Sequence, residues 1–125
     1  MFTTDIATEA QSNNAFRRVL MTTLHVQLVV MSLNPGEDIG SEVHDHTDQV
    51  LTFVEGYARA QVDGEVRDVG PGDIVIVPAG MRHNFTNVGD TTLKLYTIYS
   101  PPNHEPGTVH LTKGDAVRME EAEVN

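Results

Sequence analysis

Short apolar runs separated by Gly, Pro, Asn and Asp dominate the pattern of hydrophobic and polar positions along the chain. Residues 24–33 are rich in Val and Leu and end at Asn34-Pro35-Gly36, a sequence typical of turns. Apolar and polar side chains alternate over residues 57–62, and the Asp63-Gly64 that follows favours a two-residue hairpin. Residues 74–77 are wholly apolar, which predicts a strand buried on both faces.

The spacing of these runs predicts an all-β fold. Together with the further runs, seven such segments occur, and we expect some eight or nine short strands with turn residues between them, as in a β-sandwich or barrel. The further runs are residues 50–54, 65–69, 85–88 and 93–99. Helix signals are weak: residues 5–14 predict a loose polar arm, and residues 115–124 predict one short terminal helix.

Length and composition limit the alternatives. The 125 residues allow one domain, 1–125, with a core barrel over about residues 16–112. With 39% hydrophobic residues and a mean hydropathy of −0.24, the composition is that of a soluble globular protein. The absence of Cys excludes disulfides, thiolate zinc sites and Cys-based catalysis.

The charge balance disfavours nucleic acid as a partner. Eight Lys and Arg against eighteen Asp and Glu give a net charge of −10, which repels a phosphate backbone. The apolar runs are far shorter than a membrane span, and the first residues lack the features of a secretory signal. We therefore expect a cytoplasmic protein that binds neither nucleic acid nor a membrane.

Two segments carry a recognisable spacing of chemically useful residues. Residues 72–87 read G-x5-P-x-G-x2-H-x3-N, with His83 as the histidine. In residues 36–56, five positions separate Gly36 from Glu42, and four separate His44 from Gln49.

These segments resemble the two signature motifs of the cupin superfamily, in its small single-domain, conserved-barrel (cupin 2) type. The upstream family motif is G-x5-H-x-H-x3–4-E-x6-G, and its spacing is kept when Glu42 and His44 occupy the H-x-H positions and Gln49 the Glu position. Placing His44 and His46 on H-x-H breaks that spacing. The resemblance implies a double-stranded β-helix, or jelly-roll-like barrel, and a homodimer.

The four motif residues form a plausible metal site on physical grounds as well. Residues two apart on a strand point to one side, so Glu42 and His44 can converge, whereas Gln49 requires a bulge or turn across residues 45–48. His83 comes from a separate strand. Two imidazoles, one carboxylate and one amide oxygen suit a divalent transition metal: Zn, Fe, Mn, Ni or Co. The alternatives are a metal-free site and His46 as ligand in place of Glu42.

Other side chains are candidates for the pocket around this site. His46 is the candidate general base, since its reference pKa of about 6.5 suits proton transfer near neutrality. The candidate pocket-lining residues are His25, Gln27, Leu51, Phe53 and Phe85. Arg17 and Arg18 are candidates for anion binding or for plain surface residues, and His104 and His110 lie in or near a Pro-rich stretch without an evident partner.

Three functional hypotheses follow. The first is a metal-dependent enzyme of isomerase or lyase type, which uses the ion as a Lewis acid on a small polar carbonyl, hydroxy or sugar-like compound; its ligand types resemble those of the zinc-dependent mannose-6-phosphate isomerase branch of the superfamily. The second is a non-haem iron dioxygenase, since two His and one carboxylate suit Fe(II). The third is a cupin that binds a small molecule without chemistry.

Overall fold

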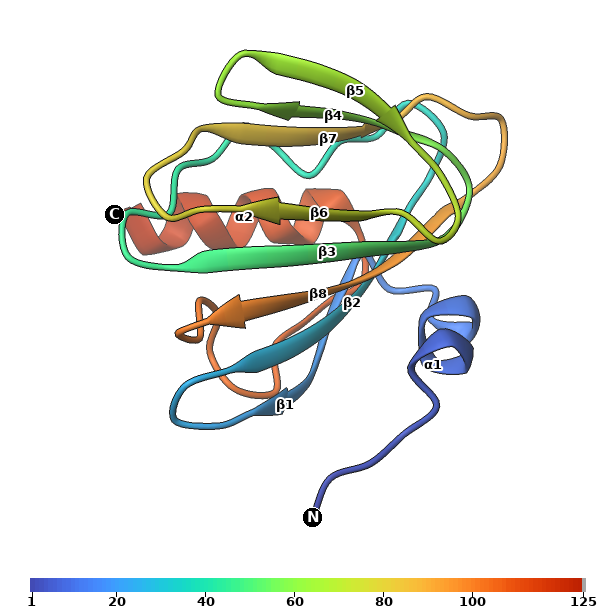
Figure 1. Cartoon of the computed structure of the whole chain (residues 1–125). Coiled ribbons are helices and arrows are strands. Elements are labelled where there is room, and N and C mark those ends of the chain that lie inside the picture. Colours follow the sequence, from blue (N-terminus) through green and yellow to red (C-terminus); the bar gives the residue numbers. More distant parts are fainter. Residues whose placement is uncertain (125) are drawn as a thin grey trace.

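Two antiparallel sheets face each other in the computed structural model, which describes residues 1–124 and the side chains of residues 1–120 (Figure 1). The larger sheet has the order β6 (Ile74–Val77), β3 (Asp48–Glu55), β8 (Leu93–Ser100), β2 (Gln27–Leu33), β1 (Arg17–Thr22) and β9 (Val109–His110). The smaller sheet has the order β5 (Glu65–Val69), β4 (Ala58–Val62) and β7 (His83–Asn87). The predicted all-β, single-domain barrel is therefore confirmed.

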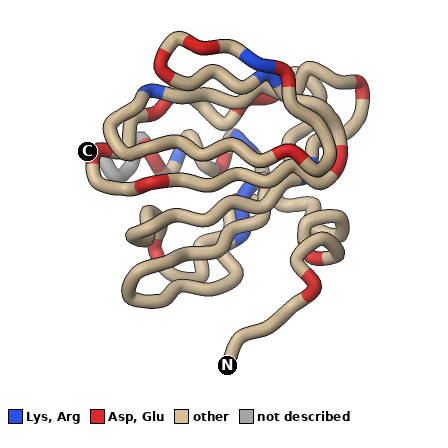
Figure 2. The backbone as a smooth tube through the Cα atoms, viewed as in Figure 1, with Lys and Arg blue, Asp and Glu red and all other residues tan. Residues whose placement is uncertain are grey.

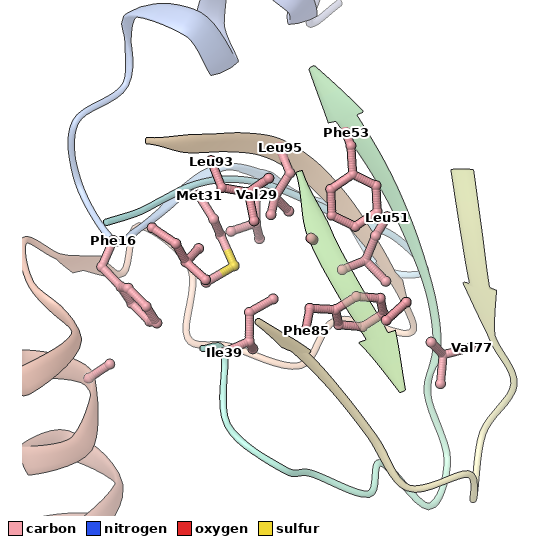
Figure 3. Packing of buried hydrophobic residues seen from close by; sticks show 14 of the residues in the cluster. Phe16, Val29, Met31, Ile39, Leu51, Phe53, Val77, Phe85, Leu93 and Leu95 are labelled. Atoms are coloured by element: carbon pink, nitrogen blue, oxygen red, sulfur yellow. The ribbon is translucent and has the colours of Figure 1, made fainter. Parts of the chain in front are cut away.

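The hydrophobic core lies between the two sheets. Strand β3 contributes Leu51 and Phe53, which alternate with outward side chains, and β7 contributes Phe85 from the opposite sheet. The rings of Phe53 and Phe85 lie 5.9 Å apart, and Figure 3 shows them packed against each other in the barrel interior. These three predicted pocket residues are thus part of the fully buried apolar core.

The predicted Asp63-Gly64 hairpin is confirmed. Both residues have positive φ, 49° and 84°, as a primed two-residue turn requires, and the turn joins β4 to β5 with Val62 opposite Glu65. The motif glycine Gly56 has a second constraint: its φ is 83°, and a Cβ there would lie 3.0 Å from the carbonyl oxygen of Thr92.

Strand β6 differs from its prediction. Ile74 and Ile76 are 60% and 62% exposed, whereas Val77 is 2% exposed. The reason is its position at the edge of the larger sheet, where one face packs on the core and the other faces outward. The expectation of a strand buried on both faces was therefore wrong.

The predicted loose N-terminal arm contains a helix, α1 (Ile6–Ser12). Asp5 caps it, because its carboxylate accepts a hydrogen bond of 3.1 Å from the Thr8 amide. Ala10 is fully buried, and α1 lies outside the larger sheet near β8 and β2 (Figure 1). The arm prediction was wrong over these residues, since a cap and one buried side chain are enough to anchor two turns.

The predicted C-terminal helix is confirmed as α2 (Lys113–Val124). It lies behind the two sheets in Figure 1, and Ala116 joins the hydrophobic core. Acidic residues lie mostly in turns and at strand ends, and the few basic residues are spread along the chain (Figure 2). Among the described residues, none of the helices has the length and apolar character needed to cross a bilayer.

Candidate metal centre

A short backbone pairing brings the two motif segments together. The Glu42 amide donates to the His83 carbonyl at 3.0 Å, and the His83 amide donates to the Glu42 carbonyl at 2.9 Å. Residues paired in this way lie directly opposite each other in an antiparallel ladder, so their side chains leave on the same face. His44, two positions after Glu42, returns to that face.

Three side chains converge there. One ligand atom from each of Glu42, His44 and His83 lies within 4.8 Å of the other two. Glu42 Oε2 lies 3.0 Å from His44 Nε2, and the rings of His44 and His83 are 5.2 Å apart. The structure therefore brings together three of the four predicted ligands at distances that one cation could span.

A backbone carbonyl sets the tautomer of His83. Its Nδ1 lies 3.0 Å from the Met81 carbonyl oxygen, which can only accept, so Nδ1 carries the proton and Nε2 keeps its lone pair. His83 is 3% exposed, and its Nε2 has no hydrogen-bond partner among the described residues. A buried imidazole held by a carbonyl on one nitrogen and free on the other is the usual arrangement of a metal-ligating His.

Gln49 is buried at the start of β3 with its amide oriented by two hydroxyls. Its Nε2 lies 3.1 Å from Thr97 Oγ1 and 3.3 Å from the Tyr99 hydroxyl. In the part of the chain that the structure describes, Gln49 Oε1 is buried without a hydrogen-bond partner. The bend that strict alternation requires between His44 and Gln49 lies at residues 45–46, so that geometric prediction is confirmed.

The local electrostatics favour the protonation states that a metal requires. Burial raises the pKa of Glu42, but the nearby His44 ring and the charges of Arg17 and His83 outweigh burial and bring that pKa below its ordinary value. Burial also lowers the pKa of His83, against the opposing effect of the Met81 carbonyl. At neutral pH the cluster therefore holds an ionised carboxylate beside a neutral His83.

A cavity of about 520 Å³ opens beside this cluster. Its wall includes Glu42 and His44 of the cluster, together with charged or imidazole side chains from distant parts of the chain. These further residues are Arg17, Arg82, His104, His110 and Glu120. The volume is in the range of small-molecule sites.

Gln27, predicted to present a polar group to the pocket, instead holds the loop that carries His104. Its Nε2 donates to the His104 carbonyl at 2.7 Å and to Thr22 Oγ1 at 2.9 Å. Its Oε1 accepts from the amides of Asn103 and His104 at 3.1 and 2.9 Å. Gln27 is a positioning residue rather than a free pocket group.

We expect Gln27→Leu to destabilise the protein by about 1–3 kcal/mol, because it leaves the buried groups of this loop without partners. The matched control is Gln61→Leu on β4, whose side chain is exposed and should change stability by no more than about 0.5 kcal/mol. Urea denaturation of the metal-free protein measures both. Equal effects of the two substitutions would contradict the role of Gln27.

Burial and charge keep His104 neutral. Burial, with the positive charge of Arg17, lowers the pKa of His104 to about 3, and the ring packs edge-on against Tyr99 at 5.2 Å. Burial likewise raises the pKa of Tyr99 to about 12. Both groups are therefore uncharged over the physiological range.

The shift of His104 predicts acid sensitivity. Between the ordinary pKa of 6.5 and the folded value of about 3, the unfolded chain binds a proton that the folded chain does not. The stability present above pH 6.5 is therefore lost as the pH falls, by about 2 kcal/mol from this ring at pH 5. Urea denaturation at pH 7.5 and 5 should show a smaller loss in His104→Gln than in the wild type, whereas His25→Gln should keep the full loss.

Two of the predicted site residues lie outside the cluster. His46 is exposed in the bend before β3, and His25 is exposed in the turn between β1 and β2. Neither contributes to the ligand cluster or lines the cavity. Each of these residues precedes a regular strand, so the alternation of that strand does not fix the direction of its side chain.

Sequence reasoning gave no place in the site to Tyr99, which contacts Gln49, or to the cavity residues His104 and His110. Arg17 was a candidate for anion binding or for a plain surface residue. It is 1% exposed, because it alternates with the exposed Arg18 and shares a face with buried Val19. The period-2 pattern of residues 17–19 was the available signal. No local pattern indicated His104 or His110, whose positions depend on how the last loop returns to β1.

Comparison with known proteins gives relatives along most of the chain. A family model described as a cupin domain matches residues 29–99. YrkC of Bacillus subtilis is 44% identical over 126 residues, which cover 96% of this chain and 68% of that protein. The crystal structure of BH2720 from Bacillus halodurans is 42% identical, with a TM-score of 0.92 over 94% of this chain and 93% of that one.

A more distant relative carries a named activity. A 5-nitrosalicylic acid 1,2-dioxygenase of Bradyrhizobium is 37% identical over 68 residues. These residues make up 54% of this chain and 32% of that protein.

Proposed function

This chain belongs to the cupin domain family, and from that membership and the Glu42/His44/His83 cluster we propose that it binds a divalent transition metal and uses it on a small polar compound. Gln49 is the proposed fourth ligand. The reaction class that the site supports best is isomerase or lyase chemistry on a carbonyl or hydroxy compound. The metal would be Zn, Fe, Mn, Ni or Co, which accept such nitrogen and oxygen ligands.

The observation that carries the proposal is the convergence of Glu42, His44 and His83, together with buried atoms that lack partners. His83 Nε2 and Gln49 Oε1 are buried without hydrogen bonds in the described part of the chain. Burying a polar atom without a partner costs about 1–3 kcal/mol. A cation at the cluster would satisfy His83 Nε2 and, with Gln49 as the proposed fourth ligand, Gln49 Oε1 as well. The approach of Glu42 to His44 is explained in the same way, since a carboxylate and an imidazole at 3.0 Å can share one ion.

Bound there, a divalent ion would act as a Lewis acid that polarises a carbonyl or hydroxyl oxygen. The chain's own residues have separate roles. Glu42 supplies the one carboxylate of the ligand cluster, so its negative charge offsets part of the ion's charge. The Met81 carbonyl fixes the direction of His83, and the Thr97 and Tyr99 hydroxyls fix that of Gln49.

A second candidate function is that of a non-haem iron dioxygenase. Two imidazoles and one carboxylate are the ligands that non-haem Fe(II) oxygenases use, and the structure brings such a set together. The similarity to the 5-nitrosalicylic acid 1,2-dioxygenase over 68 residues supports this candidate. For the first candidate, His46 stays the proposed general base, with its ring exposed in the bend before β3.

Metal analysis of protein purified without added metal distinguishes these functions. Zinc or manganese, with no oxygen uptake on addition of hydroxy acids, supports the first candidate; iron with oxygen uptake supports the second. A protein that takes up none of the five metals at neutral pH contradicts both and leaves a cupin that binds a small molecule without a metal.

A further inference from the structure

Arg17 is a buried cation in the wall of the cavity. It lies on β1 and is 1% exposed, although it lines the same cavity as Glu42 and His44. Its Nη1 lies 3.1 Å from His110 Nδ1. Because a guanidinium only donates, His110 Nδ1 accepts and that ring carries its proton on Nε2.

The charge of Arg17 has no ion-pair partner among the side chains that the structure describes. Its buried Nε has no hydrogen-bond partner among them either. Glu42 lies close enough for the charge of Arg17 to lower the pKa of its carboxyl, and Glu120 lines the same cavity. A buried charge is costly unless it is paired. Because Glu42 would bind the proposed metal, its charge would not be available to pair with Arg17.

The cavity itself supplies the place for a pairing anion. Arg17, Glu42 and His44 all line this one cavity, whose volume is about 520 Å³. One small molecule can therefore contact Arg17 and the cluster at once. A planar guanidinium can match a carboxylate in two parallel hydrogen bonds. Arg17 Nη1 is engaged by His110, whereas its Nε has no hydrogen-bond partner among the described residues. The neutral His104 and Tyr99 beside it add no competing charge.

We propose that Arg17 binds the carboxylate of the site's ligand, and that this ligand is a small monocarboxylate with a hydroxyl or keto oxygen next to the carboxylate. The carboxylate pairs with Arg17, and the neighbouring oxygen reaches the Glu42/His44/His83 cluster. The contact between the neighbouring oxygen and the cluster rests on the proposed metal function, whereas the contact between the carboxylate and Arg17 does not.

The test compares acids with their neutral amides. Lactate, pyruvate and salicylate are each titrated against lactamide, pyruvamide and salicylamide, by calorimetry, into protein freed of metal with 1,10-phenanthroline and into the same protein with zinc. We expect at least one acid to bind about 10-fold or more tightly than its amide in the zinc-containing protein. Three acids that bind no better than their amides would overturn the inference, and this comparison needs no variant.

Two variants identify the arginine responsible. Arg17→Gln should remove the preference for the acid. Arg17→Lys keeps the positive charge but loses the planar set of guanidinium donors, so it should retain only part of the preference. The matched control is Arg18→Gln, the neighbouring exposed residue on the opposite face of β1. Arg82→Gln changes the other cation of the cavity wall. Loss of the preference in Arg82→Gln but not in the Arg17 variants would also overturn the inference.

Zinc affinity, measured separately, distinguishes this inference from the proposed function. Arg17→Gln should still take up zinc, because Arg17 is not a ligand. Zinc uptake without any preference for acids contradicts the role of Arg17 and leaves the metal site intact. A preference for acids that depends on Arg17, in a protein that takes up no metal, supports the inference and contradicts the proposed function.

Discussion

Replacing His83 with Ala is expected to lower the zinc affinity of the protein by at least about 100-fold. Changing groups that merely orient a metal ligand costs about 10–100-fold, and His83 supplies a ligand atom itself. Its Nε2 is buried and unpartnered among the described residues, so the substitution removes a donor that no neighbour can replace. Calorimetric titration of zinc into the metal-free protein at pH 7.5 measures the change.

The control for this prediction is His46→Ala, which removes an exposed imidazole two positions from His44. It should leave zinc affinity within a few-fold of the wild type, whereas Glu42→Ala should reduce it far more. Circular dichroism of each metal-free variant verifies that the barrel has formed. A larger loss in His46→Ala than in Glu42→Ala would show that the wrong residue was assigned to the cluster.

Phe85→Ala is expected to destabilise the metal-free protein by about 3–5 kcal/mol. The ring is fully buried between the two sheets, packs against Phe53 at 5.9 Å and lies 6.2 Å from the ring of His83. Its removal loses the transfer free energy of the ring and leaves a cavity that the facing sheet cannot close. This is a large part of the stability of a domain of this size, which is of order 5–15 kcal/mol. Urea denaturation gives the value.

Ile76→Ala on β6 is the matched control, because it also truncates a large apolar side chain of a strand. Ile76 is 62% exposed, so the loss should stay near 0.5 kcal/mol, as is typical of surface positions (about ±0.5 kcal/mol). Comparable losses in the two variants would mean that β6 is covered by another surface in solution.

Motif spacing predicted much of the candidate site. Glu42 and His44 were placed on one face because residues two apart share a side of a strand, and the structure adds His83 opposite Glu42 through two backbone hydrogen bonds. The need for a bend before Gln49 followed from parity and is met at residues 45–46. His25 and His46, predicted to line the pocket and to act as base, lie outside regular strands, and both are exposed.

By itself, the sequence determined the all-β fold class, the turn at Asp63-Gly64 and the residues of the cluster, because local spacing and turn chemistry encode these features. Only the tertiary structure decided that β6 lies at a sheet edge and that α1 is anchored by Ala10, because burial depends on which strands become neighbours. The same holds for the cavity wall. Arg17 and His110 are 93 positions apart, and the pairing of β1 with β9 brings them within hydrogen-bonding distance, a contact that no local pattern contains.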